Sequence, residues 1–82
     1  MTGNQLKAAR ALAGMEQVKL AELAGLSVNT IRNMEASGAS VMRIRLDTLN
    51  KAKTALEAAG VEFIAENGGG AGVRLKRENH AN

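Results

Sequence analysis

The sequence predicts a mostly α-helical fold, in which four to five short helices are followed by a C-terminal β-hairpin. Three observations support this prediction. Apolar and small residues recur at helical spacing up to about residue 59, glycines rather than prolines separate the periodic segments, and the pattern changes to strand-like alternation after Gly60. The 82 residues suffice for one small domain whose core is too small to enclose a substrate.

The first helix is expected to begin within residues 2–5, where Thr and Gln have the spacing of a capping box, and to be closed by Gly14. A stripe of apolar residues that starts at Leu6 predicts the face of this helix that packs on the core. Arg10 lies at the edge of this stripe, about 40° around the helix from Leu6.

Residues 17–36 are the most informative part of the chain. A short apolar-periodic helix is expected to end at Gly25, which enters the left-handed region without a Cβ penalty and lets the chain turn sharply. Ser27 then suits the N-cap of a second helix that runs to about Ala36, because its hydroxyl can bond a free backbone amide. The spacing fits two helices joined by a turn of about three or four residues.

The second of these helices has two different faces. At about 100° per residue, Ser27, Ile31 and Met34 fall on one side and are expected to pack against the domain. The opposite, outward side carries Val28, Asn29, Arg32 and Asn33. Asn suits adenine, Arg suits guanine or phosphate, and Val can touch a thymine methyl, so this face has the chemistry of base reading. The alternative is an ordinary surface helix with a polar face, but the preceding helix and turn favour base reading.

The pattern resembles the helix-turn-helix domain of Cro and lambda-repressor type (XRE-type) regulators over about residues 3–38. The residues that carry this resemblance are Leu6, Arg10, Gly14, Gln17, Ala21, Gly25, Ser27, Ile31, Met34 and Glu35. The resemblance implies a four- to five-helix lambda-repressor-like fold in which the helix over residues 28–36 lies in the major groove of double-stranded DNA. It also implies that Gln17 sits against the DNA backbone and that Arg10 forms a structural salt bridge with Glu35. The alternative for this pair is two solvated charges that contribute little.

The segment 41–46 is open to two interpretations, a short helical turn or an extended linker. Regulators of this family often contact phosphates from the loop after the recognition helix, which favours a linker whose Arg43 and Arg45 reach flanking phosphates. The alternative is a solvated basic patch. The expected contacts to the DNA backbone are Gln17, Ser27, Thr30, Arg43 and Arg45, which fix register without reading sequence.

Asp47 is expected to cap a further helix that runs to about Ala59 and is closed by Gly60. The apolar stripe of this helix consists of Leu49, Ala52, Ala55, Leu56 and Ala59. Core packing is the first interpretation of this stripe, and a contribution to a dimer seam is the second.

The last part of the chain alternates like a β-hairpin around a glycine-rich loop. A register with Phe63 opposite Val73 gathers the apolar residues on one face and sets Glu62 opposite Arg74. A lone hairpin is barely stable and has open edges, and small XRE-type proteins that the chain resembles end in a similar hairpin. We therefore expect pairing in a homodimer, with Val61, Phe63, Ile64, Val73 and Leu75 at the interface. The alternative packs the hairpin on the helices of its own monomer.

Composition narrows the functional classes. The chain has no cysteine, which excludes disulfides and thiolate metal sites and fits the cytoplasm. No apolar run approaches the roughly 20 residues that cross a membrane. The net charge of +3 is compatible with nucleic acid, whereas a single Phe argues against stacking on single strands. His80 has no orienting partner, and no catalytic, metal-binding or cofactor-binding group and no small-molecule effector site is evident.

The sequence thus predicts a helix-turn-helix DNA-binding domain over residues 1–60, a dimerisation hairpin over 61–76 and a flexible tail over 77–82. The expected function is that of a sequence-specific regulator of transcription, not an enzyme, which binds a pseudo-palindromic operator as a homodimer. The alternative is an antitoxin or other protein-interaction module, in which an exposed hairpin binds the partner and DNA binding is autoregulatory.

Overall fold

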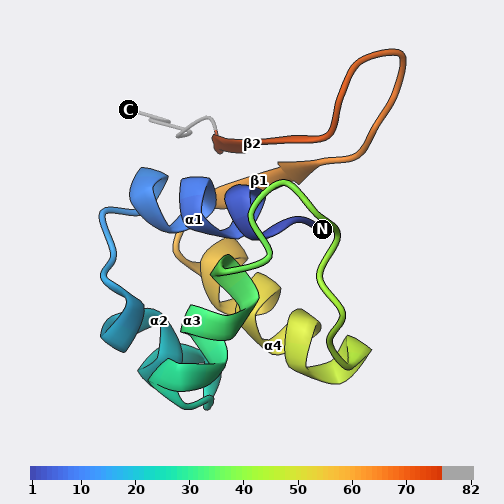
Figure 1. Ribbon diagram of the computed structural model, residues 1–82. Coiled ribbons are helices and arrows are strands. Elements are labelled where there is room, and N and C mark those ends of the chain that lie inside the picture. Colours follow the sequence, from blue (N-terminus) through green and yellow to red (C-terminus); the bar gives the residue numbers. More distant parts are fainter. Residues whose placement is uncertain (77–82) are drawn as a thin grey trace, which may run out of the picture.

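The computed structural model describes residues 1–76, which form four helices and a two-stranded antiparallel sheet (Figure 1). The elements are α1 Gly3–Leu12, α2 Gln17–Ala24, α3 Val28–Glu35, α4 Leu46–Ala58, β1 Val61–Ile64 and β2 Gly72–Leu75. The predicted fold class is confirmed, with four helices rather than five in the described part, because the chain from 41 to 45 is an irregular linker. The tail over 77–82, with His80, lies outside the described residues.

Helix α1 begins at the predicted capping box. The Thr2 hydroxyl accepts a hydrogen bond from the backbone N–H of Gln5 at 3.1 Å, and the Gln5 side chain accepts one from the backbone N–H of Thr2 at 3.0 Å. Two backbone donors at the helix start are thereby satisfied. The helix ends before Gly14, whose φ of +64° turns the chain towards α2.

The turn between α2 and α3 follows the prediction closely. Gly25 adopts the left-handed conformation with φ +69°, and the Ser27 hydroxyl accepts a hydrogen bond from the backbone N–H of Thr30 at 3.1 Å. Ile31 and Met34 are buried as expected. Ser27 itself is exposed, which corrects its expected place on the packing side: its hydroxyl serves the helix end, and no apolar surface is gained by burying it.

Helix α4 begins before the expected cap. Arg45 occupies the N-cap without a side-chain hydrogen bond, so Asp47 as the capping residue was wrong. Asp47 lies instead in the first turn, where its carboxylate is favourable near the positive end of the helix dipole. Ala52 and Leu56 are buried. Ala59 is exposed rather than part of the stripe, because the helix has already ended at Ala58.

The β-hairpin has the predicted register, with Phe63 opposite Val73 and Glu62 opposite Arg74. It packs on the helices of its own chain: β2 lies along α1, and β1 contacts α4. Val61 is 0% exposed in this core, so its side chain is not available to a second chain and its expected place in a dimer interface was wrong. The reason is that β1 starts directly after the turn that closes α4, which carries Val61 into the interior.

Phe63 and Val73 also pack partly against the core, and Ile64 is half-buried. Leu75 remains 51% exposed at the end of the same face. The hairpin lies on the side of α1 away from α2 and α3, and its loop projects beyond the helices (Figure 1). This arrangement separates the hairpin from α3.

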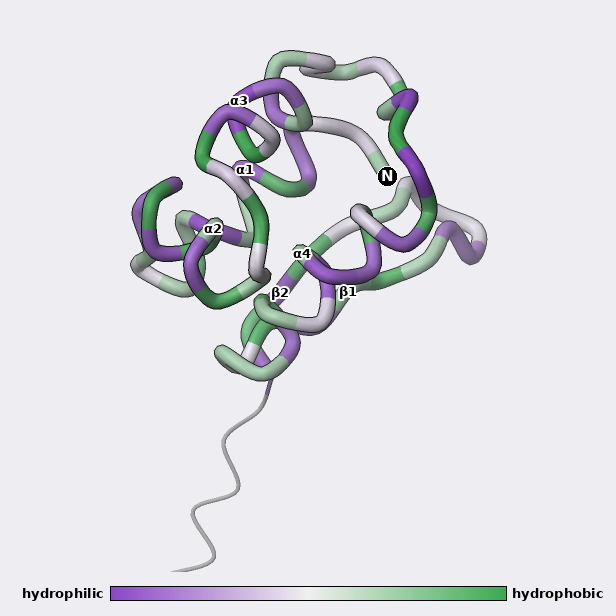
Figure 2. The backbone as a smooth tube through the Cα atoms, turned by 90° about the horizontal axis from the view of Figure 1, so that it is seen from below, coloured by the Kyte–Doolittle hydropathy of each residue, from purple (hydrophilic) through white to green (hydrophobic). Residues whose placement is uncertain are grey.

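One hydrophobic core joins these elements. Its largest fully buried side chains are Leu6, Leu20, Ile31, Met34, Leu56 and Val61, which come from all four helices and from β1. Hydrophilic and hydrophobic segments alternate along α3 (Figure 2), as expected for a helix with one buried face. Within residues 1–76, no helix has the length and apolar character that crossing a membrane requires.

Candidate nucleic-acid interface

Helix α3 packs on the domain with one face, and its opposite face is therefore exposed to solvent. Ile31 and Met34 are 0% and 2% exposed, and α3 packs against both α1 and α2. The polar residues Asn29, Arg32 and Asn33 are exposed, as the sequence predicts. A row of hydrogen-bonding side chains on a firmly seated helix is the arrangement that fits into a major groove.

Val28 differs from the other residues expected to read bases. Its side chain is half-buried and packs against the core cluster, so only part of it faces outward. This corrects the expectation that Val28 faces outward. The first turn of α3 packs against the domain, and burial of an apolar side chain there is energetically favourable.

The ion pair expected between Arg10 and Glu35 is present and is largely shielded from solvent. Arg10 Nε donates to Glu35 Oε2 at 2.8 Å, and Nη2 donates to Oε1 at 3.1 Å. The two side chains are only 16% and 6% exposed. The hydrogen bond to Glu35 raises the pKa of Arg10 above its ordinary value, so the guanidinium stays charged.

Gln17 has a second role that sequence reasoning missed. Its side-chain Nε2 donates to Glu35 Oε1 at 3.1 Å, so Glu35 binds groups from both α1 and α2. We name Arg10, Gln17 and Glu35 the polar junction. An amide has a second N–H and an oxygen, so this bond leaves Gln17 capacity to contact a phosphate. The family resemblance placed Gln17 only against the DNA backbone, and no pattern in the sequence indicated the bond to Glu35.

The start of α1 is docked on the end of α3. The backbone N–H of Gly3 donates to Ser37 Oγ at 2.8 Å, and Ser37 Oγ donates to the carbonyl of Met34 at 3.0 Å. The backbone N–H of Asn4 donates to the carbonyl of Gly38 at 2.9 Å. These contacts fix where the chain leaves α3 and enters the linker. The bonds of Gly3 and Asn4 join residues more than 30 apart in the sequence, and Gly3 was expected only as part of a cap.

The residues expected to contact the DNA backbone lie on two segments. Ser27 and Thr30 bond each other through their hydroxyls at 2.9 Å at the start of α3, where Ser27 is exposed and Thr30 half-buried. Arg43 is exposed on the linker, and Arg45 is 84% exposed with its Nε 3.3 Å from Asp47 Oδ1. A pair this exposed contributes little to stability, so Arg45 can exchange Asp47 for a phosphate at low cost.

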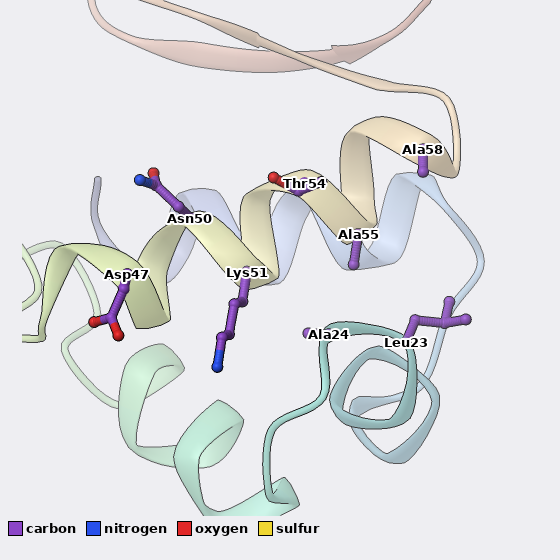
Figure 3. A pocket seen from close by; sticks show the side chains of 8 residues that line it. All are labelled: Leu23, Ala24, Asp47, Asn50, Lys51, Thr54, Ala55 and Ala58. Atoms are coloured by element: carbon purple, nitrogen blue, oxygen red, sulfur yellow. The ribbon is translucent and has the colours of Figure 1, made fainter.

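An open groove of about 600 Å³ lies between α2 and α4 (Figure 3). The close view shows Asp47, Lys51 and Ala55 projecting from α4 on the side of α2 and α3. The lining residues are Leu23, Ala24, Asp47, Asn50, Lys51, Thr54, Ala55 and Ala58. They belong to α2 and α4, so the groove is separate from the outward face of α3. In residues 1–76, no group of His, Cys, Asp and Glu is arranged to hold a metal ion.

The comparison with protein families agrees with this geometry. The family model described as helix-turn-helix matches residues 6–56, from the middle of α1 nearly to the end of α4. The chain therefore belongs to the helix-turn-helix family of Cro and lambda-repressor (XRE) type regulators, as the sequence pattern predicts. This is a family of DNA-binding regulators of transcription and not of enzymes. The comparison with curated proteins gives no match.

Proposed function

We propose that the chain is a cytoplasmic, sequence-specific regulator of transcription. It binds a pseudo-palindromic DNA operator as a homodimer. The observation that carries this proposal is α3, which buries Ile31 and Met34 and presents Asn29, Arg32 and Asn33 to the outside. These three side chains offer the donors and acceptors that distinguish base pairs in the major groove.

In this proposal, the contacts to DNA divide into two groups. Asn29, Arg32 and Asn33 contact base edges, and the exposed part of Val28 lies beside them. The contacts to the DNA backbone are made by Gln17, Ser27, Thr30, Arg43 and Arg45. Because phosphate contacts release counterions, the affinity is expected to fall steeply with salt concentration.

The homodimer is supported by the hairpin. Within the described chain the sheet has two strands, so one edge of each strand lacks a strand partner. Leu75 adds exposed apolar surface at the open end of the hairpin, and Ile64 is half-buried at the loop end of β1. Pairing of two hairpins would cover the free strand edges, Leu75 and Ile64. Phe63 and Val73 would contribute only the parts of their side chains that the core leaves exposed. Two recognition helices would then enter major grooves about 34 Å apart.

An antitoxin-like role would be favoured by an uncovered apolar hairpin face. The face formed by Val61, Phe63 and Val73 packs on the chain's own helices instead. The structure thus gives this second function no specific support.

The decisive experiment is in vitro selection of duplex sites by the full purified chain, with its mass measured in solution with and without DNA. We expect one motif with inverted half-sites and two chains per site. Asn33→Ala is expected to weaken preference at one base pair of each half-site by about 1–3 kcal/mol. Asn50→Ala, which removes an exposed Asn from α4, is the matched control and should leave the motif unchanged. Failure to select any motif would contradict the proposed function.

A further inference from the structure

Asn29 and Arg32 are linked on the outward face of α3. They are three residues apart, which places them one above the other on the helix. Arg32 Nη1 donates a hydrogen bond to Asn29 Oδ1 at 3.4 Å, and both residues are exposed. This contact uses the side-chain oxygen of Asn29, the only acceptor that the two side chains possess.

The bond changes what the two residues present to a base. The Asn29 amide retains two N–H donors, and the Arg32 guanidinium retains four of its five N–H donors and has no acceptor. The Asn29 oxygen keeps a second lone pair, but the guanidinium bound beside it repels an approaching amino group. The linked pair is therefore a cluster of donors with a positive charge.

Guanine and adenine differ in the groups that meet such a cluster. In the major groove guanine presents two acceptors, N7 and O6. Adenine presents one acceptor, N7, and the N6 amino donor, which needs an acceptor on the protein. An Asn side chain in isolation suits adenine, so the link to Arg32 reverses the preference that Asn29 would have by itself.

We propose that Asn29 and Arg32 act as one donor pair that selects guanine, with Arg32 positioning the amide of Asn29 as well as contacting the base. This inference rests on the proposed function, because it concerns the same face of α3. It names the base that this part of the face recognises.

The test starts from the selected motif of the full-length wild-type chain. The relevant base pair is the one whose preference is weakened in Asn29→Ala, where Arg32 alone still contacts the base, and we expect guanine there. Arg32→Ala frees the Asn29 oxygen and is expected to change the preferred base at that pair from guanine to adenine, by about five-fold or more. Lys7→Ala removes an exposed positive charge from α1 and serves as the control, which should keep guanine.

Modified bases test the same point without changing the protein. At the guanine in question, 7-deazaguanine removes the N7 acceptor and is expected to weaken binding of the wild-type chain at least five-fold. Inosine keeps N7 and O6 and should bind as guanine does. Circular dichroism of each variant checks that it is folded, which we expect because Arg32 is exposed.

The outcomes separate the two proposals. A selected motif that has adenine at this pair, or an Arg32→Ala chain that still prefers guanine there, would overturn the donor pair while leaving the proposed function intact. Equal binding of 7-deazaguanine and guanine would do the same. If the wild-type chain selects no motif, the proposed function fails, and the donor pair fails with it.

Discussion

The two ends of the molecule are held in different ways. Around α3, directional contacts fix the geometry: the polar junction joins three helices, and the backbone of Gly3 is bonded to Ser37. The hairpin is held mainly by apolar contact of one face with α1 and α4, and an exposed ion pair joins Glu62 of β1 to Arg74 of β2. Both ends share the same core.

This difference matches the tasks that we propose for the two regions. Base reading requires a helix at a fixed angle and depth, and hydrogen bonds with defined partners specify both. Apolar burial is non-directional, so it attaches the hairpin without specifying what its outer edge meets. Directional contacts thus specify the placement of α3, whereas apolar burial leaves the outer edge of the hairpin free for the proposed pairing with a second chain. The following experiments test this contrast, from the largest expected effect to the smallest.

Removing the centre of the polar junction should have the largest effect. Glu35→Ala leaves the Arg10 guanidinium, whose side chain is 16% exposed, without its carboxylate. We expect the free energy of unfolding, measured by urea denaturation, to fall by about 3–5 kcal/mol. Glu22→Ala breaks the exposed pair with Lys19 and should cost at most about 1 kcal/mol. Similar losses of unfolding free energy in both variants would show that the polar junction stabilises the fold no more than an exposed ion pair does.

A larger side chain where α1 approaches α3 closely should have the second-largest effect. A Cβ on Gly3 would lie 2.7 Å from both the Met34 carbonyl oxygen and Ser37 Oγ, and it would also collide with the Glu35 carbonyl oxygen. Gly3→Ala is expected to lower the free energy of unfolding by about 1–3 kcal/mol and to weaken DNA binding, because α3 is displaced. Gly69→Ala, in open space, is the control and should change neither quantity.

Truncation of an apolar side chain should have different effects at Val61 and at Leu75. Val61→Ala removes two methyl groups from a fully buried side chain, which should lower the free energy of unfolding by roughly 1.5 kcal/mol at any protein concentration. Leu75→Ala, at a residue that is 51% exposed, should change the stability of the monomer by less than about 0.5 kcal/mol. We expect it instead to raise the dimer dissociation constant measured by analytical ultracentrifugation. An unchanged dissociation constant would remove Leu75 from the proposed interface.

The smallest effect concerns the pH dependence of the hairpin. The hydrogen bond from Arg74 lowers the pKa of Glu62 below its ordinary value of 4.5. The ion pair therefore contributes fully above pH 4.5, and its contribution is lost as the pH falls through the lowered pKa of the folded state. NMR titration of the Glu62 side chain should give a midpoint below 4.5, which Arg74→Ala should raise towards the ordinary value. Identical midpoints in the two chains would refute this coupling.

Local signals in the sequence predicted the helices and the turn well. The Thr2 cap, Gly25 and Ser27 act through neighbours within a few residues, so their chemistry can be read directly from the sequence. The hairpin register followed from alternation and opposite charges on facing strands. The start of α4 was misplaced because Asp47 is equally suitable as a cap and as a first-turn residue.

Contacts between distant parts of the chain were harder to predict. Gln17 meets Glu35 across 18 residues, and Gly3 meets Ser37 across 34. The burial of Val61 likewise depended on how β1 leaves α4. The link between Arg32 and Asn29 lies within one helix, but its direction depends on side-chain conformations that spacing does not reveal.

The sequence by itself determined which face of α3 turns outward, where α1 and α3 start and where the chain turns between α2 and α3, because periodicity and caps are set by nearby residues. Only the tertiary structure decided which surfaces remain available. Packing of one element on another buried Val61, tied Gln17 to Glu35 and left Leu75 exposed, and such packing depends on all elements at once.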